Sequence, residues 1–256
     1  MFTQDSPFLN IPHDVDPKQA LFLDGMRHAV QIVDLSYKRL CQALTDLTVD
    51  QTLEKNNAKF AHIFLDAWAF VDAVDRFRNL WGLQPNAKNL PQKFSRTTLN
   101  IQLQDMRNIR NVSDHVAQRV DHIQSLNSSI SGEIKWLTEI SQAPSQIKSC
   151  FIRPGILRDS VSMKLSIDVE SLFFTNGSGS VFVKAGKYEA NLSLAYQFIR
   201  SIIESEEQKF ILSRDNTITK DYLPTDMFGS AEIHANGGLK PGTFVCKFEK
   251  KSITQK

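Results

Sequence analysis

The sequence of 256 residues has few cysteines and no cysteine pair of the kind that binds zinc. Cys41, Cys150 and Cys246 are far apart and odd in number. Without a CxxC pair, we expect neither a zinc site nor a disulfide framework, and a reducing, cytoplasmic setting fits best. The zinc-binding pattern HExxH is absent as well. We therefore expect no metal and no other cofactor.

Long apolar runs and an excess of charge of one sign are also missing. Nowhere do about 18 uncharged apolar residues follow one another, so we expect no transmembrane helix and no membrane partner. The first residues, MFTQDSPFLNIPHDVDPK, have no basic region and no long apolar core, and we expect no signal peptide. The formal net charge of +2 neither demands nor excludes a nucleic-acid partner, because a local patch can bind nucleic acid when the total charge is small.

Helical periodicity dominates the first half of the chain. Asp16 and Pro17 have the residue types of a helix N-cap and first helical position. Apolar residues then recur in steps of three and four, which marks the buried face of a long helix: Leu23, Met26, Val30, Val33, Tyr37, Leu40, Leu44 and Leu47. A second stripe from Phe60 to Trp81 ends at Gly82, which is a helix stop signal.

A third helix is predicted over residues 96–127. Its expected buried face consists of Met106, Ile109, Val112, Val116, Val120 and Ile123. Three helices of this length, each with one apolar face, indicate an antiparallel bundle.

From about residue 132 the hydrophobic period changes to two. The segment GEIKWLTEI predicts one strand, residues 161–169 predict another, and LFFTNGSGSVFV predicts two short strands around a turn. A helix of about 20 residues follows, capped by Asn191 or Ser193, and we expect it to return to the bundle as its fourth member. The remaining tail is rich in turn residues and has one further strand-like segment, TFVCKFE.

The predicted fold class is therefore α+β, mainly α. We expect an antiparallel helical bundle with a small antiparallel β-sheet inserted before the last bundle helix. The corresponding regions are a helical bundle domain (1–130), a β-sheet insertion (131–190), a returning bundle helix (191–212) and a turn-rich tail (213–256).

One segment of the third predicted helix is unusually polar. RNIRNVSDH, residues 107–115, contains two Arg, two Asn, one Asp and one His. On a helix, Arg107, Asn111 and His115 fall along one side, and Arg110 and Asp114 lie on a neighbouring side. A histidine transfers protons near neutral pH, and an arginine holds a phosphate in a bidentate fork. Together they suit cleavage of RNA without a metal, in which a ribose 2′-hydroxyl attacks the adjacent phosphorus.

The same segment carries a family resemblance. Arg110, a polar residue, three further residues and His115 resemble the signature of the HEPN-domain superfamily, and the long helices over about 17–127 are similar to that superfamily. HEPN ribonucleases are typically dimers that bring two Arg/His pairs together and cut RNA without a metal. Many of them act as toxins or in antiviral defence. The resemblance implies RNA as the substrate, a homodimer, and a cognate protein partner.

The resemblance also implies roles for individual residues. Arg110 and His115 would be the catalytic pair, with Asn111 in support. An acidic residue from the preceding long helix often joins such sites, and Asp72 and Asp75 are the candidates. Asp114, on the same side of the predicted helix as Arg110, is a further supporting candidate.

The geometry of a regular helix leaves alternatives open. Five residues rotate by about 140°, so Arg110 and His115 act together only if the helix is irregular or a second subunit supplies one of them. Arg107 lies nearer the His115 side and is a second candidate for the working arginine. Asp72 and Asp75 also fit a non-catalytic role as ion-pair partners of nearby arginines. A protein-interaction module, or a binder of nucleotides or other small ligands, thus remains beside the ribonuclease hypothesis.

Overall fold

The computed structural model describes residues 1–4, 6–49, 58–85, 91–126, 128–142, 145–155, 174–213, 222–223 and 226. The strand predicted over residues 161–169 and the strand-like segment TFVCKFE lie outside the described residues. The chain divides into two units, Met1–Leu223 and Pro224–Lys256, and only Asp226 of the second is described. The first unit contains every helix and strand considered below.

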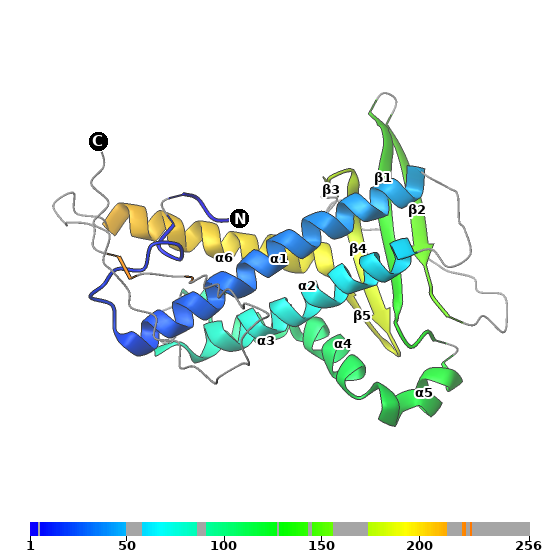
Figure 1. Cartoon of the computed structure of the whole chain (residues 1–256), viewed down its shortest axis with the longest axis horizontal. Helices are drawn as coiled ribbons and strands as arrows, with labels where there is room; N and C mark the ends of the chain where they lie inside the picture. The colour runs from blue at the N-terminus through cyan, green and yellow to red at the C-terminus, as the bar shows by residue number, and fades with distance from the viewer. Residues whose placement is uncertain are drawn as a thin grey trace, which may run out of the picture. The chain divides into compact units, whose positions relative to one another are not determined.

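Helices and one antiparallel sheet make up this unit, so the predicted α+β class, mainly α, is confirmed (Figure 1). The α-helices are α1 (Pro17–Val49), α2 (Ala58–Leu83), α3 (Arg96–Gln102), α4 (Gln104–Asp114), α5 (Val120–Ser125) and α6 (Leu192–Ser213). Short 3-10 helices cover Gln92–Phe94 and Val116–Arg119. The strands are β1 (Glu133–Gln142), β2 (Ser145–Ile152), β3 (Phe174–Thr175), β4 (Ser178–Ala185) and β5 (Tyr188–Asn191). The finer domain boundaries drawn from the sequence stay predictions.

The long helices α1 and α2 pack along one another (Figure 1). As predicted, α1 begins at Pro17, and the side chain of Asp16 caps it by accepting the backbone N–H of Gln19 at 3.0 Å. The apolar stripe of α1 is buried from Met26 to Leu47. Helix α6 packs against both α1 and α2, which places the helix expected to return from the sheet against the first two.

The sheet has the strand order β2-β1-β4, with β3 and β5 both pairing with the other edge of β4. All pairings are antiparallel. The predicted turn in NGSGS is confirmed: Asn176 and Gly177 connect β3 to β4 with φ values of 50° and 83°. Two positive φ angles in succession are those of a type I′ hairpin turn, which explains the Asn-Gly pair.

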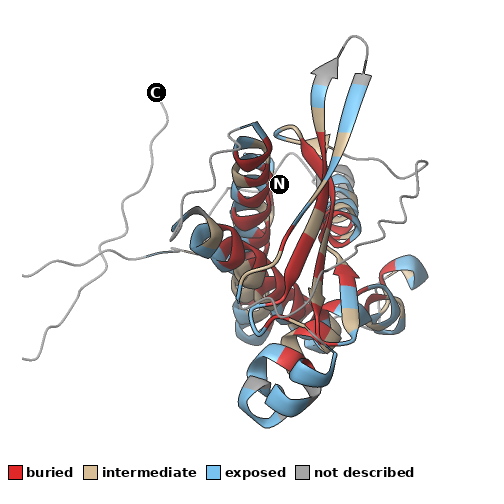
Figure 2. Cartoon of the chain, turned by 90° about the vertical axis from the view of Figure 1, so that its right-hand side faces the viewer, coloured by how far each residue is buried: buried red, intermediate tan, exposed pale blue. Residues whose placement is uncertain are grey.

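Buried hydroxyl groups join the sheet to α1. The Nε1–H of Trp136, in β1, donates to Thr48 at 3.1 Å and to Thr138 at 2.9 Å. Thr138 also lies 3.0 Å from the hydroxyl of Ser178 in β4. Figure 2 shows the buried residues concentrated where the strands meet the helices. Each of these buried polar atoms thus has a hydrogen-bond partner within the otherwise apolar interface between the sheet and the helices.

The start of α6 resolves the choice between the two predicted caps. Asn191 caps the helix, because its side chain accepts the backbone N–H of Leu194 at 3.0 Å. The hydroxyl of Ser193 instead accepts the backbone N–H of Val181 at 2.8 Å and the hydroxyl hydrogen of Tyr37 at 2.8 Å. Ser193 therefore connects α6, β4 and α1.

The prediction of one continuous helix over residues 96–127 is wrong. The backbone breaks at Leu103, with φ −111° and ψ 14°, and again at His115, with φ −114° and ψ 25°. Ser113 and Asp114 precede the second break, and such side chains compete for backbone hydrogen bonds and weaken a helix end. The break also changes the buried face, since Val120 is 42% exposed while Ile123 is buried.

Candidate functional site

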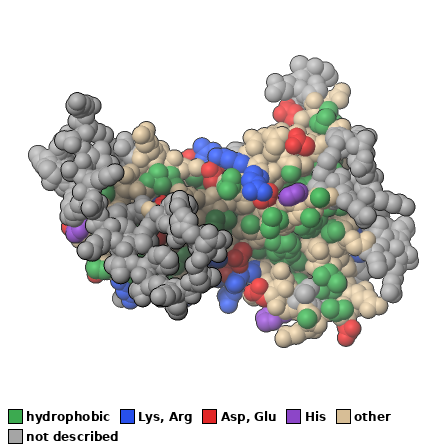
Figure 3. All heavy atoms as spheres, viewed as in Figure 1, with side chains coloured by type: hydrophobic (Ala, Val, Ile, Leu, Met, Phe, Trp, Pro, Cys, Tyr) green, Lys and Arg blue, Asp and Glu red, His purple; other side chains and the backbone are tan. Residues whose placement is uncertain are grey.

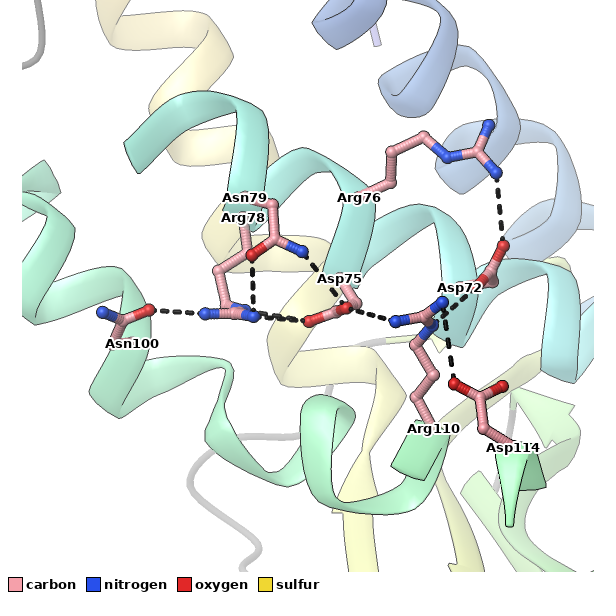
Figure 4. Close-up of polar contacts among 8 residues, drawn as sticks. All are labelled: Asp72, Asp75, Arg76, Arg78, Asn79, Asn100, Arg110 and Asp114. Carbon is pink, nitrogen blue, oxygen red and sulfur yellow. Dashed lines mark hydrogen bonds and ion pairs between the residues drawn. The ribbon is translucent and has the colours of Figure 1, made fainter. Parts of the chain in front are cut away.

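The candidate site lies where α4 packs against the middle of α2. Residues three and four apart on a helix share a face, so Asp72, Asp75 and Asn79 of α2 form one polar row. Figure 4 shows this row facing Arg110 of α4. Met106, Ile109 and Val112 of α4 are buried, and their burial fixes α4 so that Arg110 reaches α2.

Arg110 is surrounded by three carboxylates. Its Nε donates to Asp72 at 2.8 Å and its Nη1 donates to Asp75 at 3.1 Å. Its Nη2 forms an ion pair with Asp114, one turn further along α4, at 3.7 Å. The side chain is 39% exposed, so part of the guanidinium still faces solvent. The hydrogen bond to Asp72 is the main reason that the pKa of Arg110 is raised above its usual value, and burial acts in the opposite direction.

The carboxylate of Asp75 is the centre of the cluster. It is only 4% exposed, and its second oxygen accepts two hydrogen bonds from Arg78, at 2.9 and 2.8 Å. Asn79 adds a hydrogen bond at 3.3 Å to the oxygen that faces Arg110. Each oxygen of Asp75 thus accepts two hydrogen bonds, which offsets the cost of burying its charge.

The charges of the cluster balance. Arg76 contacts Asp72 at 3.4 Å, so the cluster contains Arg76, Arg78 and Arg110 against Asp72, Asp75 and Asp114. The sequence-based alternative that the two α2 aspartates serve as ion-pair partners of nearby arginines is confirmed as geometry. The same contacts also join Arg110 to two acidic residues of the preceding long helix.

His115 directly follows the C-terminal end of α4 and is the residue at which the helix breaks. Its side chain is exposed and makes no hydrogen bond or ion pair within the described part of the chain. Asn111 is partly buried on the last full turn before it. Helix α4 is regular from Arg110 to Asp114, and the irregularity begins at His115 itself. The helix that was predicted to continue past residue 115 stops there.

Arg107 belongs to a different part of this surface. It is exposed and lines a small cavity together with Arg78, Asn79, Arg96 and Asn100, at the junction of α2, α3 and α4. The structure thus separates the two candidate arginines of α4. Arg110 faces the carboxylates, whereas Arg107 faces other donors.

Sequence reasoning missed three residues that complete this region. Asn79 bonds both Asp75 and Arg78, and its spacing of four from Asp75 was a signal for it. Asn100 accepts from Arg78 at 2.6 Å, across 22 residues of sequence, and no local pattern announces such a contact. Arg96 reaches the cavity because α3 turns back along α2.

An apolar surface adjoins the end of α4. A hollow of about 450 Å³ is lined by Ala61, Phe64, Leu65, Trp68, Ser113, Ile130 and Ser131. Leu65 is 61% exposed and Ile130 is also 61% exposed. Figure 3 shows hydrophobic side chains gathered on this side of the molecule, next to a group of charged residues. Exposed apolar surface of this kind is typical of interaction sites.

No family model matches this chain, and no curated protein or solved structure matches it either. No described helix combines the length and the apolar character that crossing a membrane requires. Among the described residues, no three His, Cys, Asp or Glu side chains form a group suited to hold a metal ion.

Proposed function

We propose that this chain is a HEPN-like protein that cleaves RNA without a metal, using Arg110 and His115. The observation that carries the proposal is the position of Arg110. Its guanidinium is oriented by Asp72 and Asp75 of the preceding long helix, and its own helix ends at an exposed His115. A fixed arginine and an uncommitted histidine on the same helix end are the two groups that phosphodiester cleavage needs.

In this proposal His115 transfers the proton and Arg110 stabilises the phosphate. His115 accepts the proton of a ribose 2′-hydroxyl, whose oxygen attacks the adjacent phosphorus. The bond from phosphorus to the 5′-oxygen breaks, which leaves a 2′,3′-cyclic phosphate and, after protonation, a 5′-hydroxyl. Among the described residues, hydrogen bonds to Asp72 and Asp75 use two of the five N–H groups of Arg110. In this proposal the other three stabilise the charge on the phosphate, which competes with Asp114 for Nη2.

A second copy of the chain completes the site in this proposal. The apolar hollow around Leu65 includes Ser113, two residues before His115. A dimer formed through this surface buries the exposed Leu65 and Ile130 and brings two copies of the α4 end toward one another. RNA as substrate, a cognate protein partner, a toxin or defence role and a cytoplasmic setting belong to the same proposal.

One observation favours a non-catalytic alternative. Asp72, Asp75 and Asp114 surround Arg110, and three carboxylates compete with a phosphate for the same guanidinium. In that alternative the cluster only holds α4 on α2, and the apolar surface binds a protein partner.

The deciding experiment is cleavage of labelled RNAs of diverse sequence in the presence of EDTA. We expect the wild-type protein to produce fragments with 2′,3′-cyclic phosphate ends. His115→Ala and Arg110→Ala are each expected to lower the rate by about a hundredfold or more.

Two variants serve as matched controls. His62→Ala removes an exposed histidine of α2, and Arg200→Ala removes a half-exposed arginine of α6. Both are expected to cleave like the wild type. Circular dichroism checks that Arg110→Ala remains folded. An inactive wild type, or equal cleavage by His115→Ala, rejects the ribonuclease proposal and leaves the non-catalytic alternative.

A further inference from the structure

A second polar site lies beside the carboxylate cluster, at the junction of α2, α3 and α4. It is a cavity of about 180 Å³ lined by Arg78, Asn79, Gly82, Leu83, Arg96, Asn100 and Arg107. Every charged side chain in this lining is an arginine, and both amide side chains carry N–H groups. Among the described residues, no carboxylate lines the cavity, and the acidic partner of Arg78, Asp75, is not part of its lining.

Arg78 forms the inner wall of this cavity. Its side chain is 8% exposed, and hydrogen bonds to Asp75, Asn79 and Asn100 hold it in one orientation. These contacts use four of its five N–H groups and leave one on Nη1. Asn100 accepts from Arg78 through its oxygen, so both N–H groups of its amide remain for another acceptor.

Arg96 and Arg107 form the outer wall. Both are exposed, and neither side chain makes a hydrogen bond or an ion pair within the described part of the chain. The charge of Arg78 is balanced by Asp75, so Arg96 and Arg107 bring two uncompensated positive charges to this small cavity. Like charges held this close repel one another, and an anion bound between them offsets the repulsion because it attracts each guanidinium.

We propose that this cavity binds a phosphomonoester dianion, the terminal phosphate of a nucleotide or of an RNA 5′ end. Planar guanidinium forks match the oxygens of a phosphate and bind them in pairs. The two uncompensated charges of Arg96 and Arg107 favour a dianion over the single charge of a phosphodiester in the middle of a strand. The proposal is independent of RNA cleavage, because it rests on Arg78, Arg96 and Arg107 and not on Arg110 or His115.

Isothermal titration calorimetry tests this site with four probes: inorganic phosphate, a nucleoside 5′-monophosphate, and a short RNA with either a 5′-phosphate or a 5′-hydroxyl. The measurements use the full chain with His115→Ala in the background, which prevents cleavage during titration. We expect saturable binding of inorganic phosphate that weakens with added salt. Arg96→Ala and Arg107→Ala are each expected to weaken it about tenfold, as the loss of a charge-assisted hydrogen bond does.

The RNA and nucleotide arms identify the source of the phosphate. If the 5′-phosphorylated RNA binds more tightly than both the 5′-hydroxyl RNA and the mononucleotide, the cavity recognises an RNA end. If the mononucleotide binds as tightly as the 5′-phosphorylated RNA, the cavity recognises the terminal phosphate alone. Arg200→Ala is the matched control and is expected to bind like the parent protein.

Three results would overturn the proposal. The first is the absence of saturable binding of inorganic phosphate, and the second is an unchanged affinity for phosphate in the folded Arg96→Ala/Arg107→Ala double variant. The third is that the RNAs with and without a 5′-phosphate bind equally well and that the double variant binds neither. None of them bears on the cleavage test, which reads a reaction rate and not an equilibrium affinity.

Discussion

Asp75 accepts a hydrogen bond from Arg110 at 3.1 Å, although 35 residues separate them in the sequence. The same buried carboxylate accepts two hydrogen bonds from Arg78 of its own helix. One acidic side chain therefore fixes an arginine on each of two packed helices. Its removal leaves Arg78 buried without its charge partner, and this is the basis of the first prediction.

Asp75→Ala is expected to lower the free energy of unfolding by about 3–5 kcal/mol, because it leaves a buried guanidinium uncompensated. Asp72→Ala is the matched control, since Asp72 contacts the same Arg110 but is 48% exposed. Its cost is expected to be about 1 kcal/mol or less. Urea denaturation of the two variants measures both values. Equal losses would contradict the central role given to Asp75.

Two inactive variants are expected to regain RNA cleavage when they are mixed, if the proposed catalytic pair is shared between subunits. Arg110→Ala and His115→Ala homodimers each lack one member at both sites. A mixed dimer regains one complete site when the Arg of one subunit works with the His of the other. Cleavage is measured after the purified variants are mixed and allowed to exchange subunits. Activity that stays at the level of the separate variants argues against a shared site.

The apolar surface near the end of α4 gives a prediction for the oligomeric state. Leu65→Glu places a charge on this surface and is expected to shift the proposed dimer to a monomer, as measured by analytical ultracentrifugation. Leu21→Glu is the control, because Leu21 is more exposed, at 74%, but belongs to α1. A dimer that tolerates Leu65→Glu would place the interface elsewhere.

The lowered pKa of Asp34 predicts that the folded protein loses stability in acid. Burial alone would raise its pKa, but hydrogen bonds from Lys38, the amino group of Met1 and Tyr196 outweigh burial and hold the pKa below its ordinary value of 3.8. A lowered folded-state pKa means that the stabilisation is present above pH 3.8 and disappears as the pH falls through the folded value.

The stability difference between the wild type and Asp34→Asn should therefore be largest near neutral pH and shrink below pH 3.8. Urea denaturation at pH 7 and at pH 3 provides the two values. A difference that is the same at both pH values would show that the charge of Asp34 does not contribute.

Cys41 is expected to be unreactive in the folded protein. Burial raises the pKa of its thiol to about 12, and a hydrogen bond with Tyr37 only partly opposes this. In a Cys150→Ser/Cys246→Ser variant, where Cys41 is the remaining cysteine, a thiol reagent at pH 8 should react only after urea is added. Rapid modification without urea would mean that α1 opens locally around this position.

The sequence predicted the elements whose signals are local. The cap at Asp16, the stripe from Met26 to Leu47 and the Asn176–Gly177 turn each depend on neighbouring residues, and all three were found where expected. The contacts of Asp72 and Asp75 with arginines were also expected, because these residues recur at helical spacing along α2.

The rest depends on contacts that the sequence does not encode locally. The break at His115 divides a pattern whose periodicity continues to Ile123, so the sequence alone favoured one helix. The hydrogen bond from Arg78 to Asn100 and the position of Arg96 at the cavity exist only because α3 folds back along α2. The separation of Arg107 from the carboxylates around Arg110 could likewise be seen only after α4 was placed.

The position of Asp75 between two arginines has a consequence for how this region responds to ligands. Arg78 lines the cavity at the α2–α3–α4 junction, Arg110 faces the outer surface, and both bond the same buried carboxylate. A ligand that shifts either guanidinium changes the charge balance felt by the other. Any resulting change in affinity is mutual, because the coupling free energy between two sites has one value in both directions. If both proposed sites bind their ligands, Asp75 is the residue that would couple them.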